Sequence, residues 1–192
     1  MIAIIDYKAG NISSVRNALS RFGYECVITD DSEVILQADK VIFPGVGEAS
    51  SAMAILKEKG LDKTIKSLTQ PVLGICLGMQ LMCIYSEEGQ TQCLGIFDTE
   101  VKRFPANEMV PHMGWNSLSN VEGELFEQIE TDSDVYYVHS YYAEICSSTI
   151  AKTEYLLPFT AALQKDNFYA TQFHPEKSAG MGAQILKNFL EL

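Results

Sequence analysis

The stretch Pro71-Val-Leu-Gly-Ile-Cys-Leu-Gly-Met-Gln80 decides the fold of this chain. Its short apolar run, from Val72 to Ile75, is typical of a buried strand. The residues that follow, 79–85, have the apolar spacing of a helix. The stretch therefore predicts a strand that turns sharply into a helix, with Cys76 at the turn.

Two glycines flank Cys76 and indicate that this turn holds a nucleophile. Gly74 and Gly78 lie two residues on either side of Cys76, which is the G-x-nucleophile-x-G pattern of a strand-to-helix elbow, with sulfur in place of oxygen. A Cβ atom at either glycine would collide with the neighbouring strand or helix. The free N–H groups and positive dipole end of the new helix favour a thiolate. Cys76 is therefore a candidate nucleophile.

Working outward from the elbow, strands alternate with helices in the first half of the chain. We expect strands at 2–5, 26–28, 40–43, 135–138, 142–146, 159–163 and 168–173, and helices at 12–21, 49–59, 65–68 and 181–190. Strands separated by helices predict a mostly parallel central sheet with helices on both faces. The strand-rich second half predicts an added antiparallel portion. We expect a single α/β domain.

Composition excludes several classes of partner. The 192 residues carry a formal net charge of -11, which argues against nucleic acid and anionic membranes. No apolar run approaches the roughly 20 residues of a membrane span, and the opening apolar run is too short for a signal peptide. Five cysteines without C-x-x-C spacing argue against a disulfide framework or a zinc site. We expect a cytoplasmic protein with no metal.

A cysteine nucleophile needs a general base and a residue that orients this base. The chain has three histidines, and His174 lies in the segment Thr171-Gln-Phe-His-Pro-Glu-Lys177, at the carboxyl end of a predicted strand. Pro175 prevents a helix from carrying Glu176 away. The sequence therefore predicts a triad of Cys76, His174 and Glu176.

The turn Pro44-Gly-Val-Gly47 follows another predicted strand and supplies candidate donors for an oxyanion. We expect N–H groups of Val46 and Gly47 to act together with the backbone N–H of Leu77. Gln80 lies four residues after Cys76, on the same helix face, so it can reach a substrate held at the sulfur.

Each of these three motifs also has an ordinary structural explanation. The elbow could hold a buried structural cysteine, the His174 segment could be a surface turn, and the glycine turn could be only a tight connection. Their occurrence together, each at the carboxyl end of a predicted strand, favours catalysis.

The motifs also resemble those of a known family. Gly74-Ile-Cys-Leu-Gly-Met-Gln80 and Phe173-His-Pro-Glu176 are similar to the signatures of class I (triad) glutamine amidotransferases. Pro111-His-Met-Gly-Trp-Asn116 and Val138-His-Ser-Tyr141 resemble segments of the glutaminase subunits of imidazole glycerol phosphate synthases. The resemblance covers essentially the whole chain. One position departs from it, because Lys8 stands where the family commonly has glycine.

The resemblance implies a flavodoxin-like glutamine amidotransferase domain over residues 1–192 that needs no cofactor. It would hydrolyse glutamine and pass the ammonia to a (β/α)₈-barrel cyclase subunit in a heterodimer, for histidine biosynthesis. The residues implied in glutamine binding are Gly47, Gln80, His139, Ser140 and Tyr141. The residues implied at the partner interface are Asn11, His112, Met113, Trp115, Asn116 and Lys177, with Trp115 in a loop-like segment.

Two other functions stay open. The chain could be a cysteine hydrolase or peptidase of the related superfamily, although those enzymes usually have a glutamate before the elbow and lack His-Pro-Glu. It could also be a catalytically silent regulatory subunit, against which the intact set of Cys76, His174 and Glu176 counts.

Overall fold

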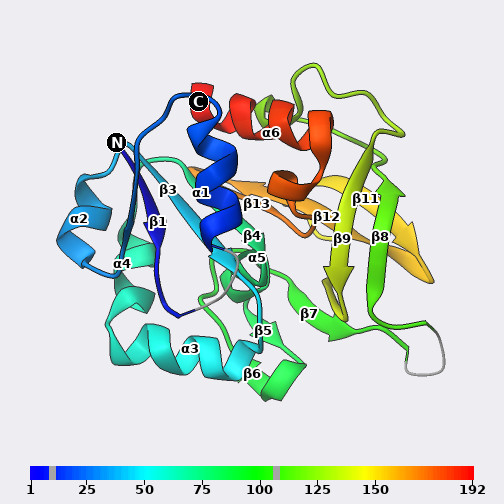
Figure 1. The fold of residues 1–192 in the computed structure, drawn as a ribbon. Coiled ribbons are helices and arrows are strands. Elements are labelled where there is room, and N and C mark those ends of the chain that lie inside the picture. Colours follow the sequence, from blue (N-terminus) through cyan, green and yellow to red (C-terminus); the bar gives the residue numbers. More distant parts are fainter. Residues whose placement is uncertain (9–11, 106–108) are drawn as a thin grey trace.

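Seven strands form the central sheet of the protein (Figure 1). The computed structural model describes residues 1–8, 12–105 and 109–192. The sheet order is β11-β12-β13-β4-β3-β1-β2. The strands are β1 (Ile2–Ile5), β2 (Cys26–Thr29), β3 (Lys40–Gly45), β4 (Val72–Cys76), β11 (Thr149–Tyr155), β12 (Leu157–Lys165) and β13 (Phe168–Thr171).

Five neighbouring strands, from β13 to β2, are parallel, and β12 and β11 extend the sheet in antiparallel pairing. Every residue of β1, β4 and β13 is buried. Such continuous apolar strands are expected where both faces of a parallel sheet are covered. The carboxyl ends of β3, β4 and β13 meet at one edge, which positions the site described below.

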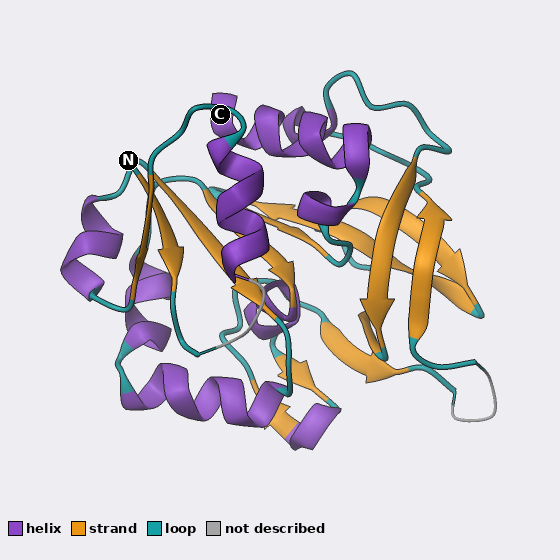
Figure 2. Ribbon diagram, viewed as in Figure 1, coloured by secondary structure: helices purple, strands orange, loops and turns teal. Residues whose placement is uncertain are grey.

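Helices cover both faces of the sheet (Figure 2). On one face, α1 (Ile12–Ser20) and α6 (Ala179–Glu191) contribute apolar side chains to one core. The other core includes side chains of four helices. These are α2 (Ser32–Gln37), α3 (Ala49–Glu58), α4 (Leu61–Ser67) and α5 (Leu77–Met82).

Two small sheets complete the fold. A four-stranded sheet has the order β10-β7-β5-β6, and β8 pairs with β9 in an antiparallel ribbon. The strands are β5 (Tyr85–Ser86), β6 (Thr91–Gln92), β7 (Glu100–Arg103), β8 (His112–Ser117), β9 (Asp134–His139) and β10 (Tyr141–Ala143). Single 3₁₀ turns are η1 (Glu88–Gln90), η2 (Glu124–Phe126) and η3 (Pro175–Lys177). Among the described residues, no helix is long and apolar enough to cross a membrane.

The predicted fold class is confirmed, with a mostly parallel sheet, helices on both faces and an antiparallel portion. The elbow helix was predicted over 79–85 but begins at Leu77 and ends at Met82. It ends early because the carbonyl groups of residues 81–83 accept hydrogen bonds from the N–H groups of residues 94–96. These carbonyls are then not used to continue the helix.

Other predicted boundaries were also wrong. The helix predicted at 65–68 is the longer α4, and α2, β7 and β11 were not predicted. Trp115, expected in a loop-like segment, lies in β8, where its partner is Tyr136 of β9. The interrupted apolar pattern around Gly114 hides this strand, which depends on pairing with residues 17 to 27 positions away.

Candidate active site

Cys76 is the last residue of β4 and lies immediately before α5. Its backbone has φ 55° and ψ -108°, a conformation that residues with a side chain rarely adopt. Strain of this kind persists only where the surrounding structure enforces it, and it is concentrated at functional sites. The elbow predicted from the sequence is therefore present, with the cysteine at its most strained position.

The glycines of the elbow are required by close packing. A Cβ atom on Gly78 would lie 1.9 Å from the carbonyl oxygen of Phe43, and one on Gly74 would lie 2.6 Å from Sδ of Met82. A Cβ atom on Gly45 would lie 2.1 Å from the hydroxyl oxygen of Tyr7. α5 is thus packed directly against β3.

Tyr7 fixes the start of the glycine turn. Its buried hydroxyl donates a hydrogen bond to the carbonyl oxygen of Pro44, at 2.8 Å. Val46 and Gly47 follow in the exposed part of the turn. Gly47 has φ 119°, a conformation that favours glycine, so the turn is anchored at Pro44 and exposed at its tip.

His174 and Glu176 lie next to the elbow, just after β13. Nδ1 of His174 is 2.8 Å from Oε1 of Glu176, and both side chains are almost completely buried. The backbone on either side is held in place, because the N–H of His174 donates to the carbonyl oxygen of Tyr136 and the hydroxyl of Ser178 donates to the carbonyl oxygen of His174. The ring therefore has one fixed position.

The other ring nitrogen of His174, Nε2, is buried without a nitrogen or oxygen hydrogen-bond partner among the described residues, and the ring interacts with the thiol group of Cys76. Burial by itself lowers the pKa of His174. The negative charge of an ionised Cys76, and the hydrogen bonds with Cys76 and Glu176, outweigh this effect and raise the pKa overall. The structure thus favours a charged imidazolium ring at His174, held between Cys76 and Glu176.

Two further groups touch the sulfur of Cys76. The carbonyl oxygen of Val138 lies 3.9 Å away, and Nε2 of Gln172 lies 3.6 Å away. Gln172 was not among the predicted site residues. The sequence did contain a clue to Gln172, because it lies two residues before His174, and extended residues two positions apart face the same side.

A cavity of about 330 Å³ opens in front of the sulfur. Eight of its lining residues were predicted as site residues, namely Val46, Gly47, Cys76, Leu77, Gln80, His139, Ser140 and Tyr141. Glu88, Pro111 and Val138 complete the lining and were not predicted. The structure therefore brings Cys76 of the predicted triad, the glycine turn and the 139–141 segment together around one space.

Glu88 places a carboxylate at this cavity. Its Oε2 accepts a hydrogen bond from the N–H of Ala49, at 2.9 Å, at the start of α3. Burial raises the pKa of Glu88, the N–H of Ala49 lowers it, and the charge of Glu48 raises it. The overall pKa of Glu88 is raised, because burial is the largest of these effects.

A pair of buried histidines supports the wall of the cavity. Nδ1 of His139 lies 2.7 Å from the carbonyl oxygen of Tyr141, so Nδ1 carries the proton, since a carbonyl oxygen can only accept. Nε2 of His139 then accepts from Nδ1 of His112, at 2.9 Å, and Nε2 of His112 accepts from Asn116, at 3.2 Å. Burial is the main cause that lowers the pKa of His112 to about 4 and of His139 to about 3, so both rings are neutral.

The residues predicted at a partner interface fall into two groups. Met113 and Trp115 are 62% and 54% exposed, and the exposed Lys177 has its Nζ atom 6.0 Å from the ring centroid of Tyr136. His112 is only 3% exposed, so its side chain is buried within this subunit, and its place at a partner interface stays a prediction. It is buried because it bonds to His139 and stacks on Tyr155, with ring centroids 4.0 Å apart.

The two asparagines predicted at the interface, Asn116 and Asn11, are not tested by exposure. Asn116 is partly buried, with its amide nitrogen also donating to the carbonyl oxygen of Glu154. Asn11 lies outside the described residues.

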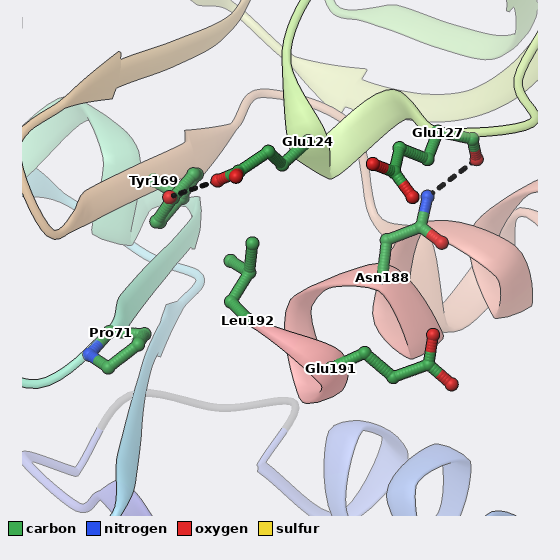
Figure 3. Close-up of a pocket in the computed structure, with 7 residues that line it drawn as sticks. All are labelled: Pro71, Glu124, Glu127, Tyr169, Asn188, Glu191 and Leu192. Atoms are coloured by element: carbon green, nitrogen blue, oxygen red, sulfur yellow. Dashed lines mark hydrogen bonds between the residues drawn. The ribbon is translucent and has the colours of Figure 1, made fainter.

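A second cavity, of about 400 Å³, lies away from the triad (Figure 3). Its lining residues are Pro71, Glu124, Glu127, Tyr169, Asn188, Glu191 and Leu192. Tyr169 donates to Glu124, and the amide nitrogen of Asn188 donates to the carbonyl oxygen of Glu127. This cavity contains no nucleophile. Within the described part of the chain, no group of three His, Cys, Asp or Glu side chains could hold a metal ion.

The α/β fold, the strained cysteine and the buried histidine–carboxylate pair define the class of cysteine-dependent triad enzymes. Residues 3–192 match the protein family Glutamine amidotransferase class-I. The chain therefore belongs to the class I glutamine amidotransferase family and is a glutamine amidotransferase.

Individual relatives agree with this assignment. The chain is 62% identical to the imidazole glycerol phosphate synthase subunit HisH of Bacteroides fragilis, over 100% of this chain and 99% of that protein. It is 50% identical, with the same coverage, to the protein of that name from Pectobacterium atrosepticum. A crystal structure of a putative GMP synthase component from Thermoplasma acidophilum has the same fold, with a TM-score of 0.76 at 20% identity, covering 99% of this chain and 92% of that one.

Proposed function

We propose that the chain is the glutaminase subunit of an imidazole glycerol phosphate synthase. It hydrolyses glutamine to glutamate and ammonia and supplies the ammonia to a cyclase subunit. The observation that carries the proposal is the position of Cys76, next to the His174–Glu176 pair and open to a cavity of about 330 Å³. The names of the full-length relatives support the choice of synthase.

In the first step, the thiolate of Cys76 attacks the side-chain amide carbon of glutamine. A carbon–sulfur bond forms, and the carbonyl oxygen becomes an oxyanion. The imidazolium of His174 gives its Nε2 proton to the amide nitrogen, the carbon–nitrogen bond breaks, and ammonia leaves. The high pKa of His174 suits this role, because the ring is charged at neutral pH before the reaction begins.

The oxyanion needs donors that point to it in the transition state. We assign this role to the backbone N–H of Leu77, at the start of α5, together with N–H groups of Val46 and Gly47. Leu77, Val46 and Gly47 all line the cavity beside the sulfur. The absence of a Cβ atom at Gly47 allows the peptide before it to turn over, which would gate the oxyanion site.

In the second step, water hydrolyses the γ-glutamyl thioester. Neutral His174 now accepts a proton from the attacking water, and the carbon–sulfur bond breaks to release glutamate and the Cys76 thiolate. Glu176 holds Nδ1 throughout, so that Nε2 faces the reacting atoms in both steps.

Recognition of glutamine is assigned to the rest of the cavity lining. Gly47, Gln80, His139, Ser140 and Tyr141 surround the substrate. We add Glu88, because its carboxylate is the charged acceptor that the α-ammonium group of glutamine requires. No cofactor enters this chemistry.

We further propose that the partner is a (β/α)₈-barrel cyclase, which uses the ammonia to make imidazole glycerol phosphate and aminoimidazole carboxamide ribotide. The exposed face formed by Met113, Trp115 and Lys177 is the proposed contact in the heterodimer. Exposed aromatic residues are common anchors of protein interfaces. Residues 1–192 act as one amidotransferase domain, and the free cysteines suit a reducing cytoplasm.

Glutamine hydrolysis by Cys76→Ala is the first test, with Cys26→Ala as the matched control at a half-buried cysteine in β2. Cys76→Ala should keep its circular dichroism spectrum and lose turnover, while Cys26→Ala keeps both. Unchanged turnover in Cys76→Ala would contradict the proposal. Cleavage of peptides without glutaminase activity would instead favour a peptidase.

A second test measures glutaminase activity in the presence and absence of the barrel partner with its nucleotide ligand. We expect low activity alone and stimulation in the loaded complex, because the exposed tip of the glycine turn can open or close the oxyanion site. High activity that does not depend on the partner would contradict this gating. Failure of a glutamine-directed electrophile to label Cys76, even in the complex, would favour a silent regulatory subunit.

A further inference from the structure

An unbroken hydrogen-bonded chain runs beneath the cavity to the nucleophile. Nε2 of Gln80 donates to the carbonyl oxygen of Tyr141, at 2.9 Å, and to Oε1 of Gln172, at 2.9 Å. Nε2 of Gln172 in turn lies 3.6 Å from Sγ of Cys76. Two side-chain amides therefore connect a backbone carbonyl group to the sulfur.

The orientation of both amides follows from that carbonyl group. The oxygen of Tyr141 can only accept, so the atom of Gln80 that faces it must be the NH₂ group. The second N–H of this group then requires an acceptor, so Gln172 presents its oxygen to Gln80. The amide nitrogen of Gln172 is left facing Cys76. The sulfur therefore meets a donor.

Burial holds this arrangement in place. Gln172 is 0% exposed and Gln80 is 4% exposed. The backbone N–H of Gln172 also donates to the carbonyl oxygen of Ala161 in β12, at 2.8 Å. Reversal of either amide would bring two donors or two acceptors together away from water, which is costly.

The surroundings of the sulfur differ for its two protonation states. A thiol can donate to the carbonyl oxygen of Val138, at 3.9 Å. A thiolate gains instead from the N–H of Gln172 and from the imidazolium of His174. Hydrogen bonds to a charged partner are roughly twice as strong as neutral ones, so the amide stabilises the thiolate more than the thiol.

We propose that Gln172 is a further catalytic residue, which holds negative charge on the Cys76 sulfur through its amide N–H and fixes Gln80 through its amide oxygen. The proposal rests on the glutaminase function proposed above. Because both N–H groups of Gln80 are engaged, only its amide oxygen remains for the cavity. Gln80 is therefore an acceptor for a donor group of the substrate, and cannot act as a donor.

The test replaces Gln172 by methionine, which keeps the length of the side chain and removes both amide functions. Gln37→Met is the matched control, at an exposed position at the end of α2. Alkylation of Cys76 by iodoacetamide is followed against pH. In Gln172→Met, the pH of half-maximal alkylation should rise by about one unit, the tenfold change expected for loss of a charge-assisted hydrogen bond. A midpoint unchanged from wild type would overturn the proposal.

Kinetics separate the two roles of Gln172. For Gln172→Met, kcat for glutamine should fall about 10-fold or more and KM should rise, because both the thiolate and the position of Gln80 are affected. Gln80→Met should raise KM and move the alkylation midpoint by less than Gln172→Met does, because Gln172 keeps its own contact with the sulfur. If Gln80→Met moved the midpoint as far as Gln172→Met does, the direct contact of Gln172 with the sulfur would be refuted.

A measurement on the unaltered chain covers the case in which Gln172→Met does not fold. The side-chain amide resonances of Gln172 are followed by ¹⁵N NMR against pH. They should move with the same midpoint as Cys76 alkylation, and resonances that stay constant would refute the contact. An active Cys76→Ala would instead overturn the glutaminase function itself, so the two failures are distinguishable.

Discussion

Gly78 offers the sharpest test of how the elbow is built. A Cβ atom there would lie 1.9 Å from the carbonyl oxygen of Phe43 and 2.9 Å from its carbonyl carbon. Both are backbone atoms of β3, so no side-chain rotation relieves the contact. Gly180 is the matched control, because it also lies in a helix, α6, and its Cβ atom would meet nothing within 4 Å.

The two substitutions to alanine share one favourable effect and differ in one unfavourable effect. In a helix, alanine is more stable than glycine by up to about 1 kcal/mol. At Gly78 this gain is opposed by overpacking, which is typically about 1–3 kcal/mol and larger where backbone must move. We expect Gly78→Ala to lower the free energy of unfolding by roughly 2 kcal/mol, and Gly180→Ala to raise it by about 0.5 kcal/mol.

Urea unfolding followed by circular dichroism measures both changes. For a chain of this size, the expected loss in Gly78→Ala corresponds to a Tm about 4–8 °C lower. Gly78→Ala should also slow alkylation of Cys76, because α5 and the sulfur must shift away from β3. A Gly78→Ala variant as stable as Gly180→Ala would refute the argument that the elbow is packed directly on β3.

Three other predictions follow from titrating groups and from strain. Because folding raises the pKa of His174, the stability that its protonated ring contributes is complete below about pH 6.5 and is lost as the pH rises through the folded pKa. Glu176→Gln should lower the folded pKa of His174, and NMR titration of the ring measures this change. Because burial lowers the pKa of His112 to about 4, stability should decrease as the pH falls below about 6.5, by at most about 1.4 kcal/mol per unit, and His112→Asn should reduce this slope in urea unfolding. Lys8 has φ 65°, so Lys8→Gly should raise the free energy of unfolding by about 0.5–1 kcal/mol, and an unchanged Tm would contradict this.

The elbow could be predicted because its information is local. An apolar strand, two glycines and a helix within about ten residues specify one turn, and the structure has it at Cys76. The pairing of His174 with Glu176 is also local, since the two residues are two positions apart. Short-range constraints of this kind can be recognised in one sequence.

The rest of the site depends on contacts between distant parts of the chain. The burial of His112 follows from its hydrogen bond to His139, 27 residues away, and the role of Gln172 depends on Gln80, 92 residues away. Glu88 reaches the cavity only because the small four-stranded sheet folds beside α3. No pattern near Glu88 in the sequence specifies that placement.

The order of the site along the chain has a consequence for synthesis. Cys76 and Gln172 are 96 residues apart, and His174 follows Gln172 after β12 and β13 have joined the sheet. During synthesis, Cys76 therefore leaves the ribosome long before its general base, His174, has been added to the chain. A chain that ends before Gln172 lacks both partners of the sulfur, so we expect activity only after β13, the last strand of the central sheet to be made, is in place.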